Sequence, residues 1–368
     1  MDKLKQSTVD IDTINNIFGN TYFKINKELQ ELVGLWPYQK GFSVRVVQTI
    51  MLFVLSFIMI PHLNGIRVWC GKDLGICSEN IAATIYLSGC FLKYLVVLLC
   101  KRDISKVYEK IAINWLTIND PNERVILDKF SSLGKLKSIG YTVYVSAAGI
   151  GFSQFALLPF AFDYFSPLQN GSRPKIRIVR AEFFVDPIEY YWHIYATYCI
   201  VTFVSAFTII SIDTSYTAVV HQNLGIFNIV KFNNLIEVTY RVCFLLLILV
   251  CISFLTFGAI TILENSDNWI DIVRLGSIEV GAVIHLFYLS WPGQLVVSES
   301  EELYYYTYNN EWYNLSAESK TLLHFMMLRC INPCCLTAAG LYVMNFENYG
   351  AIIKSTVSYI TVLSSFRE

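Results

Sequence analysis

Long apolar runs separated by shorter polar segments dominate this chain. Seven runs have the roughly 20 residues that a helix rising about 1.5 Å per residue needs to cross the hydrocarbon core of a bilayer. They are residues 44–61, 81–100, 139–162, 191–212, 242–263, 270–297 and 347–366. The pattern predicts an all-α polytopic membrane protein with seven transmembrane helices.

The segments outside these runs have patterns of their own. Residues 1–43 combine mixed charges with apolar positions at loosely helical spacing, which predicts an amphipathic piece on the membrane surface, ended by Gly34 and Pro37. Residues 298–320 are polar and rich in aromatic side chains, and a helix is expected at 321–329. The apolar stretch 334–345 is too short to span, so we treat it as the approach to the last run.

Composition narrows the class of protein. With 54% hydrophobic and only 15% charged residues, the chain is too apolar for an ordinary soluble domain. Its net charge of −1 and its lack of a basic tract speak against nucleic acid as a partner. We expect no cleavable signal peptide, because the first 40 or so residues lack a short apolar core, and insertion then relies on the first span.

The distribution of Lys and Arg predicts the orientation. These residues accumulate on the cytoplasmic side of membrane proteins, and most of them fall on the side of the N-terminal segment. The N-terminus is therefore expected to be cytoplasmic and the C-terminus extracellular. Asn170, in the sequon Asn-Gly-Ser of the outer segment between spans three and four, is then a candidate glycosylation site. The sequon at Asn314 lies in an inner segment and should stay unmodified.

Most of the ten cysteines lie inside apolar runs, where cysteine behaves as a small hydrophobic residue. Cys70 and Cys77 instead share a polar loop, and the sequence leaves open whether they are bonded or free. Cys330, Cys334 and Cys335 have no further ligand at metal spacing except the distant His324, so we predict no metal site. No cofactor motif is present either.

Ionisable residues within the spans each have a structural and a functional interpretation. Lys93 lies in the inner half of the second span, and its stem is long enough to reach the cytoplasmic surface. Arg274 and Glu279 are poorly placed for one helical face, so either one faces a vestibule or reaches the interface. For His285, in the middle of the sixth span, a hydrogen bond to a neighbouring hydroxyl is favoured over a ligand contact.

Catalytic motifs are missing from the sequence. The spans contain no paired carboxylates at catalytic spacing, no His-Glu-x-x-His, no Gly-x-Ser-x-Gly and no phosphate-binding glycine loop. We therefore expect no enzyme activity, and the remaining polar residues suit binding and conduction.

The last run carries a stripe of small polar residues on one helical face. Ser355, Ser358, Val362 and Ser365 recur at spacings of three and four. Small residues at such spacing are typical of close packing between transmembrane helices. The same stripe also fits a water-lined path with a single apolar constriction, and the residues alone favour packing.

The motifs before this stripe carry a resemblance to a known family. In order, they are Trp291-Pro-Gly-Gln-Leu295, Ser298-Glu-Ser-Glu-Glu-Leu303, Tyr308, Trp312, Ser319-Lys320, Met326-Met-Leu-Arg329, Asn332-Pro333, Ala338-Ala-Gly340, Phe346 and Ser358-Tyr359. This run resembles the C-terminal signature of insect odorant receptors, which are ligand-gated cation channels. The resemblance extends more loosely to Gly34-Leu-Trp-Pro37 and to the segment ending Glu182-Phe-Phe-Val-Asp-Pro187.

The resemblance implies a pocket for small volatile organic ligands in the outer halves of spans two, three, four and six. Such a pocket should be enclosed, aromatic and sparse in polar groups. The candidates are Tyr86, Cys90, Phe91, Gly149, Phe152, Phe155, Tyr195, Tyr198, Thr202, Ile278, Ala282 and His285. Ordinary packing explains many of these aromatic residues equally well.

The resemblance also implies a channel assembled with an odorant receptor co-receptor, as a heteromer of four subunits in the plasma membrane of a sensory neuron dendrite. Val362 matches the hydrophobic gate position, with Ser355, Ser358 and Ser365 along the pore. The chain then divides into an N-terminal segment (1–43), a six-helix ligand-binding region (44–297), a cytoplasmic subunit-contact segment (298–333) and a pore-lining closing helix (334–368).

Some features depart from the family pattern. Segment 213–241 is short, whereas family members extend both flanking helices into the cytoplasm, so assembly is in question. Gln294 stands where asparagine is common. The ending from Ser358 to Phe366 partly resembles the gustatory branch of the superfamily, although serine at both polar positions favours the odorant branch. A gustatory receptor, a metabotropic seven-span receptor and a transporter remain as alternatives, while a long insert typical of the co-receptor is absent.

Overall fold

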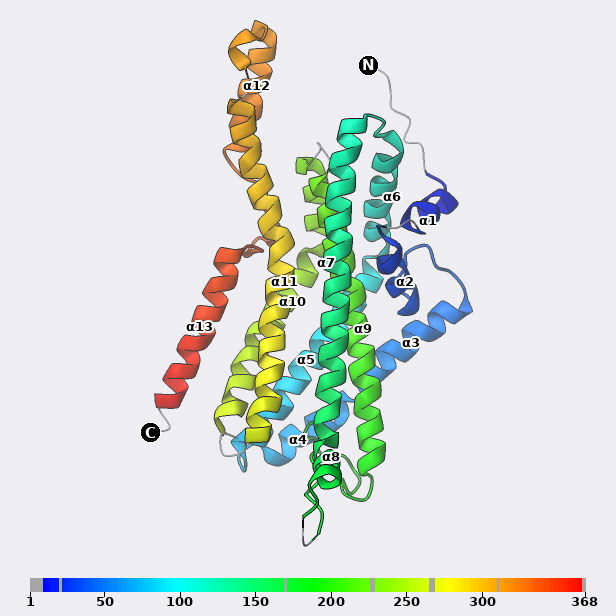
Figure 1. Cartoon of the computed structure of the whole chain (residues 1–368), viewed down its shortest axis with the longest axis vertical. Coiled ribbons are helices and arrows are strands. Elements are labelled where there is room, and N and C mark those ends of the chain that lie inside the picture. The colour runs from blue at the N-terminus through cyan, green and yellow to red at the C-terminus, as the bar shows by residue number, and fades with distance from the viewer. Residues whose placement is uncertain are drawn as a thin grey trace.

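The computed structural model describes residues 9–19, 22–168, 171–225, 229–264, 269–309 and 311–365. Its elements form an elongated helical bundle (Figure 1). The helices are α1 (Ile11–Gly19), α2 (Lys24–Leu32), α3 (Phe42–Phe57), α4 (Met59–Trp69), α5 (Leu74–Leu99), α6 (Lys101–Thr117), α7 (Pro121–Gln154), η1 (Phe155–Leu157), α8 (Leu158–Phe165), α9 (Tyr191–Leu224), α10 (Ile229–Glu264), α11 (Trp269–Tyr308), η2 (Trp312–Asn314), α12 (Ala317–Cys330) and α13 (Phe346–Ser365). Two short strands, β1 (Thr337–Ala338) and β2 (Tyr342–Val343), precede α13.

Six helical segments of the described chain are long and apolar enough to cross a membrane. They are Phe42–Trp69, Leu74–Leu99, Pro121–Phe165, Tyr191–Leu224, Leu235–Glu264 and Ile270–Tyr308, and they match the first six predicted spans, with the second ending one residue before the predicted Cys100. The predicted seventh span corresponds to α13, whose 20 residues have the length for a crossing. Glu347, Lys354 and several hydroxyl side chains make α13 less apolar than the other six.

Several helices are longer than the sequence pattern predicts. Helix α11 continues through Pro292 and past residue 298 to Tyr308, so the predicted boundary after residue 297 lies inside an unbroken helix. Helix α9 runs to Leu224 and α10 begins at Ile229. Both flanking helices therefore continue well beyond the apolar runs predicted as spans four and five.

The N-terminal helices pack on protein, whereas the sequence predicted that they lie on a membrane surface. Ile14, Phe18 and Val33 are almost completely buried. The ring of Phe18 lies 4.8 Å from that of Tyr108 on α6, and Nε2 of Gln30 donates to Oγ of Ser215 on α9 over 2.8 Å. The apolar stripe of this amphipathic segment is used to cover the bundle, because burying it there removes the same area from water.

Residues 334–345 form a small hairpin that leads into α13. β1 and β2 are antiparallel, with Thr337 opposite Val343, and Gly340 at the turn has a positive φ of 74°. Helix α13 then lies beside α10 and α11, outside the main bundle (Figure 1). Stacked rings of Phe287 and Phe346, with centroids 5.2 Å apart, fasten the start of α13 to α11.

The contact between α11 and the hairpin is unusually close at Gly293. A Cβ atom on this residue would overlap the backbone carbonyl oxygen of Met344. Only glycine permits this approach, which gives the Trp291-Pro-Gly motif a packing role. The Trp291 ring meanwhile has the Nζ of Lys137 on α7 4.0 Å from its centroid.

Candidate functional site

A cavity of about 620 Å³ lies inside the bundle, walled mainly by α5, α7, α9, α10 and α11. Its volume is in the range of small-molecule sites. The wall is largely apolar, with few polar groups at separate positions. Such a space suits a ligand that offers hydrocarbon surface and one or two hydrogen-bonding groups.

Ten of the twelve candidate ligand-binding residues line this cavity. They are Tyr86, Cys90, Gly149, Phe152, Phe155, Tyr198, Thr202, Ile278, Ala282 and His285. Phe91 and Tyr195 are not among the lining residues. Phe91 follows Cys90 by about 100° around α5 and so points to another side, while the Tyr195 ring packs 5.9 Å from that of Trp192.

The wall contributed by α10 was missed by the sequence reasoning. Leu246, Val250, Phe254 and Gly258 all face the cavity. Helix α10 is apolar on all sides, so no periodic pattern marks which of its residues face inward. The close approach of α10 to α5 depends on Gly89, where a Cβ would come within 2.7 Å of the Val250 side chain.

The end of the cavity near Lys93 holds a buried charged pair. Lys93, only 7% exposed, forms an ion pair with Asp213 of α9. The expectation that Lys93 extends to the cytoplasmic surface is therefore wrong. The buried carboxylate of Asp213 compensates the Lys93 ammonium group more strongly than contact with the membrane interface would. Sequence reasoning missed Asp213 because it lies one residue beyond the predicted fourth span.

His285 and Tyr141 extend this pair into a network. The Tyr141 hydroxyl donates to Oδ2 of Asp213 over 3.2 Å and also bonds Nδ1 of His285. Since a tyrosine has one proton to donate, His285 must carry its proton on Nδ1 and donate it to the Tyr141 oxygen. The predicted hydroxyl partner of His285 is thus present, and His285 lines the cavity as well.

The end of the cavity near Arg274 holds a second ionic cluster. NH1 of Arg274 lies 2.8 Å from Oε1 of Glu79, and Nε of Arg180 lies 2.6 Å from Oε2 of the same carboxylate. NH2 of Arg274 also contacts Asp271 at 3.0 Å. Arg274 is 1% exposed, so its side chain is surrounded by protein. The cluster ties α5 and α11 to the segment that precedes α9.

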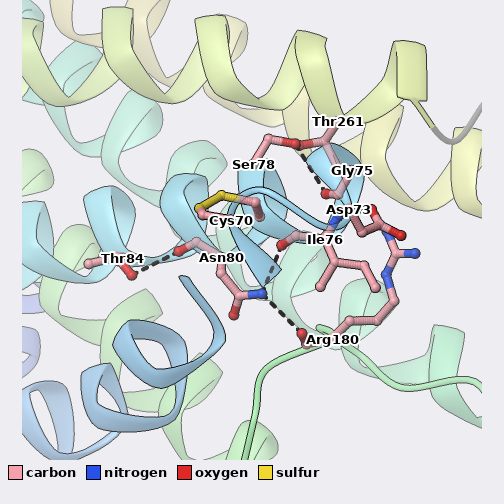
Figure 2. The surroundings of a disulfide bond; sticks show 10 residues. Cys70, Asp73, Gly75, Ile76, Ser78, Asn80, Thr84, Arg180 and Thr261 are labelled. Atoms are coloured by element: carbon pink, nitrogen blue, oxygen red, sulfur yellow. Dashed lines mark hydrogen bonds between the residues drawn. A yellow bond between two sulfur atoms is a disulfide. The ribbon is translucent and has the colours of Figure 1, made fainter. Parts of the chain in front are cut away.

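The neighbouring loop is held by a disulfide between Cys70 and Cys77, whose Cα atoms are 5.0 Å apart (Figure 2). The question left open by the sequence is thereby answered. Oδ1 of Asp73 caps α5 by accepting from the Ile76 amide over 2.8 Å. Nδ2 of Asn80 donates to the carbonyl oxygens of Ile76 and Arg180 (Figure 2). These contacts tie the loop and the start of α5 to the segment that precedes α9.

The candidate pore residues lie apart from the cavity, on α13. Ser355, Ser358, Val362 and Ser365 are exposed, with Val362 at 52%. Ile352, at another position around the helix, is buried. The small-residue stripe of α13 is therefore exposed and not covered by the described part of the same chain. Asn170, the candidate glycosylation site, lies outside the described residues.

Comparison with known proteins gives two kinds of likeness. Residues 227–357 match the family model described as 7tm Odorant receptor. Odorant receptor 10 of Aedes albopictus is 26% identical over 131 residues, which are 34% of this chain and 33% of that relative. The sequence likeness therefore covers about a third of each protein.

The likeness of fold covers nearly the whole chain. The olfactory receptor OR5 from Machilis hrabei, solved in complex with eugenol, superposes with a TM-score of 0.76 at 13% sequence identity, over 94% of this chain and 100% of that one. A second structure of the same receptor superposes with a TM-score of 0.76 at 13% sequence identity, over 96% of this chain and 99% of that one.

Proposed function

We propose that this chain is a member of the insect odorant receptor family and serves as a ligand-tuned receptor subunit. Its C-terminal sequence and its fold support this premise. It binds a small volatile organic molecule in the cavity and gates a non-selective cation channel together with the co-receptor. The proposal includes the cytoplasmic N-terminus, the plasma membrane of a sensory neuron and a tetrameric assembly.

The observation that carries the proposal is the largely apolar cavity of about 620 Å³ between the helices. Removing a ligand's apolar surface from water contributes roughly 25 cal/mol per Å². This is ample to bias two channel states that differ by a few kcal/mol. The olfactory receptor of the same fold that was solved with eugenol supports a small organic ligand here.

Helix α11 connects the cavity to the proposed pore. Its outer half carries Ile278, Ala282 and His285 in the cavity wall. Its middle contacts α13 through Phe287 and the end of the preceding hairpin through Gly293. A ligand that shifts α11 would move α13 with it. In an assembly, Val362 side chains around an axis would block ions by excluding water, and the nearby serines would line the open path.

The inner end of α11 with α12 offers a surface for subunit contact. The described part of this region exposes many large aromatic and aliphatic side chains, among them Tyr305, Tyr306, Trp312 and Phe325. It extends away from the bundle (Figure 1). Exposed apolar surface of this kind is typical of protein interfaces.

Current recordings with and without the co-receptor test the proposal. We expect odorant-evoked cation current only when both chains are present, and we expect it to persist when G proteins are blocked. Second-messenger signalling without direct conductance would instead identify a metabotropic receptor. Tags at both ends of the chain provide a second check, because an N-terminal tag accessible on intact cells contradicts the proposed orientation.

A further inference from the structure

One charged residue of the cavity is left without a partner. The basic residues of its wall and rim all have acidic partners, namely Lys93 with Asp213, Arg274 with Glu79 and Asp271, and Arg180 with Glu79. Glu279 of α11 also lines the cavity, yet its carboxyl group forms no hydrogen bond or ion pair with the described residues. Counted over the described residues of wall and rim together with these partners, acidic groups outnumber basic groups by one.

The position of Glu279 is made by a glycine on the facing helix. A Cβ on Gly258 of α10 would overlap Oε1 of Glu279. The carboxyl group thus occupies the space that any other residue at position 258 would fill. It lies between the outer cluster at Arg274 and the inner network at His285, in the middle of the cavity wall.

A carboxylate in this position lacks a cation that compensates its negative charge among the described residues. An ionised carboxylate in an apolar space is costly unless a cation compensates it. The protein's own cations are already engaged at the two ends of the cavity. A ligand that supplies a positive charge would remove this cost, while apolar residues such as Phe254 and Ile278 would cover its hydrocarbon part.

We propose that Glu279 makes the cavity selective for small organic amines with a hydrocarbon body. The inference rests on the proposed function and deepens it by naming a ligand class. An amine that arrives neutral takes the proton of the Glu279 carboxylic acid, and one that arrives as an ammonium ion pairs with the carboxylate directly. Both routes end in the same ammonium–carboxylate pair. Alcohols can hydrogen-bond to Glu279 but leave the charge uncompensated.

Binding to the purified full chain in lipid nanodiscs tests the proposal without a channel readout. The probes are two matched sets, hexylamine, hexanol and heptane, and 2-phenylethylamine, 2-phenylethanol and propylbenzene. Glu279→Gln keeps the size of the side chain and removes its charge. We expect it to weaken amine binding by about tenfold or more, equivalent to about 1.4 kcal/mol, and to leave the hydrocarbons within about twofold.

Two further variants sharpen the test. Glu299→Gln makes the same chemical change on α11 away from the cavity wall, and it should leave the binding of every probe unchanged. Gly258→Ala pushes the carboxyl group out of its space and should also weaken amines selectively. Amine affinity that is unchanged in Glu279→Gln overturns the proposal, as does an equal loss for amines and hydrocarbons or a wild-type protein that binds no amine.

The binding assay also separates this inference from the proposed function. Amine binding that depends on Glu279, combined with no current in the presence of the co-receptor, contradicts the channel but keeps the ligand class. Odorant-evoked current with no role for Glu279 contradicts the ligand class and keeps the channel.

Discussion

Lys93 and Asp213 illustrate how a single buried charge determines its surroundings. Each is nearly inaccessible to solvent, and each compensates the other. Tyr141 donates a hydrogen bond to the Asp213 carboxylate, and His285 is hydrogen-bonded to the Tyr141 hydroxyl. The pair joins α5 to α9, and its partners bring in α7 and α11, so four cavity helices meet at one carboxylate.

Removing one member of the Lys93–Asp213 pair should lower the unfolding free energy of the protein. Asp213→Asn leaves the Lys93 ammonium buried without its counter-charge, and we expect a loss of about 3–5 kcal/mol in unfolding free energy. Replacing both residues, as Lys93→Met with Asp213→Leu, should recover most of that loss. Chemical unfolding in detergent measures both. Lys106→Met, which breaks an exposed pair with Asp103, is the control and should change stability by about 1 kcal/mol or less.

If Asp213→Asn unfolds at the same denaturant concentration as the wild type, the ion pair does not stabilise the bundle. Equal losses in the single and double variants would instead show that packing volume, and not charge, is what matters at this position.

The connection between α11 and α13 depends on close packing at one point. Stacked Phe287 and Phe346 rings lie next to the contact of Gly293 with the Met344 backbone. Phe346 also donates its amide hydrogen to Oε1 of Gln294 over 3.1 Å. Most of the other surface of α13 is exposed, so the docking of this helix within one chain relies on a small area.

Gly293→Ala should separate binding from gating. The new Cβ would overlap the Met344 carbonyl oxygen, so the hairpin and α13 must shift away from α11. We expect ligand affinity in the cavity to stay within about twofold and the ligand-evoked current to fall by about tenfold or more, since packed interfaces do not deform gradually. Binding and current measurements on the same variant check this.

Gly276→Ala on the same helix is the matched control, because a Cβ there meets nothing within 4 Å. Its current should equal that of the wild type. A normal current in Gly293→Ala, at normal surface expression, would show that this contact does not transmit the ligand signal.

The shape of the whole molecule separates three regions along its length. The cavity lies between the helices of the bundle. Helix α12 lies at one end of the molecule and α13 stands to the side (Figure 1). The exposed stripe on α13 and the exposed aromatic residues near α12 are surfaces that a single chain leaves open. Both are accounted for by the proposed assembly of several subunits around a shared axis.

Val362→Ser should open the proposed gate. In the assembled channel, a polar ring at this position would hold water where valine excludes it, so we expect current without ligand to rise by about tenfold. Val357, similarly exposed on another side of α13, provides the control variant Val357→Ser, which should leave resting current unchanged. Whole-cell recordings with the co-receptor measure the resting current of both variants. Equal resting currents in the two would show that Val362 does not form the gate.

Apolar run lengths alone located the first six spans, because a helix crossing lipid must satisfy its backbone internally and present apolar side chains along most of its length. The same local pattern, with the family resemblance, pointed to Tyr86, Cys90, Phe152 and other residues that the fold brings to one cavity. It also misjudged where the helices end, since α9 and α11 continue beyond their apolar parts.

Which charges meet was decided by tertiary structure. Glu79 and Arg274 are 195 residues apart in sequence, and Lys93 and Asp213 are 120 apart, so no local periodicity relates them. The inward face of α10, the burial of α1 and α2, and the unpaired carboxyl of Glu279 beside Gly258 likewise depend on which helices pack together. Sequence pattern reports what each segment can bury, whereas the packing of distant segments decides what it is buried against.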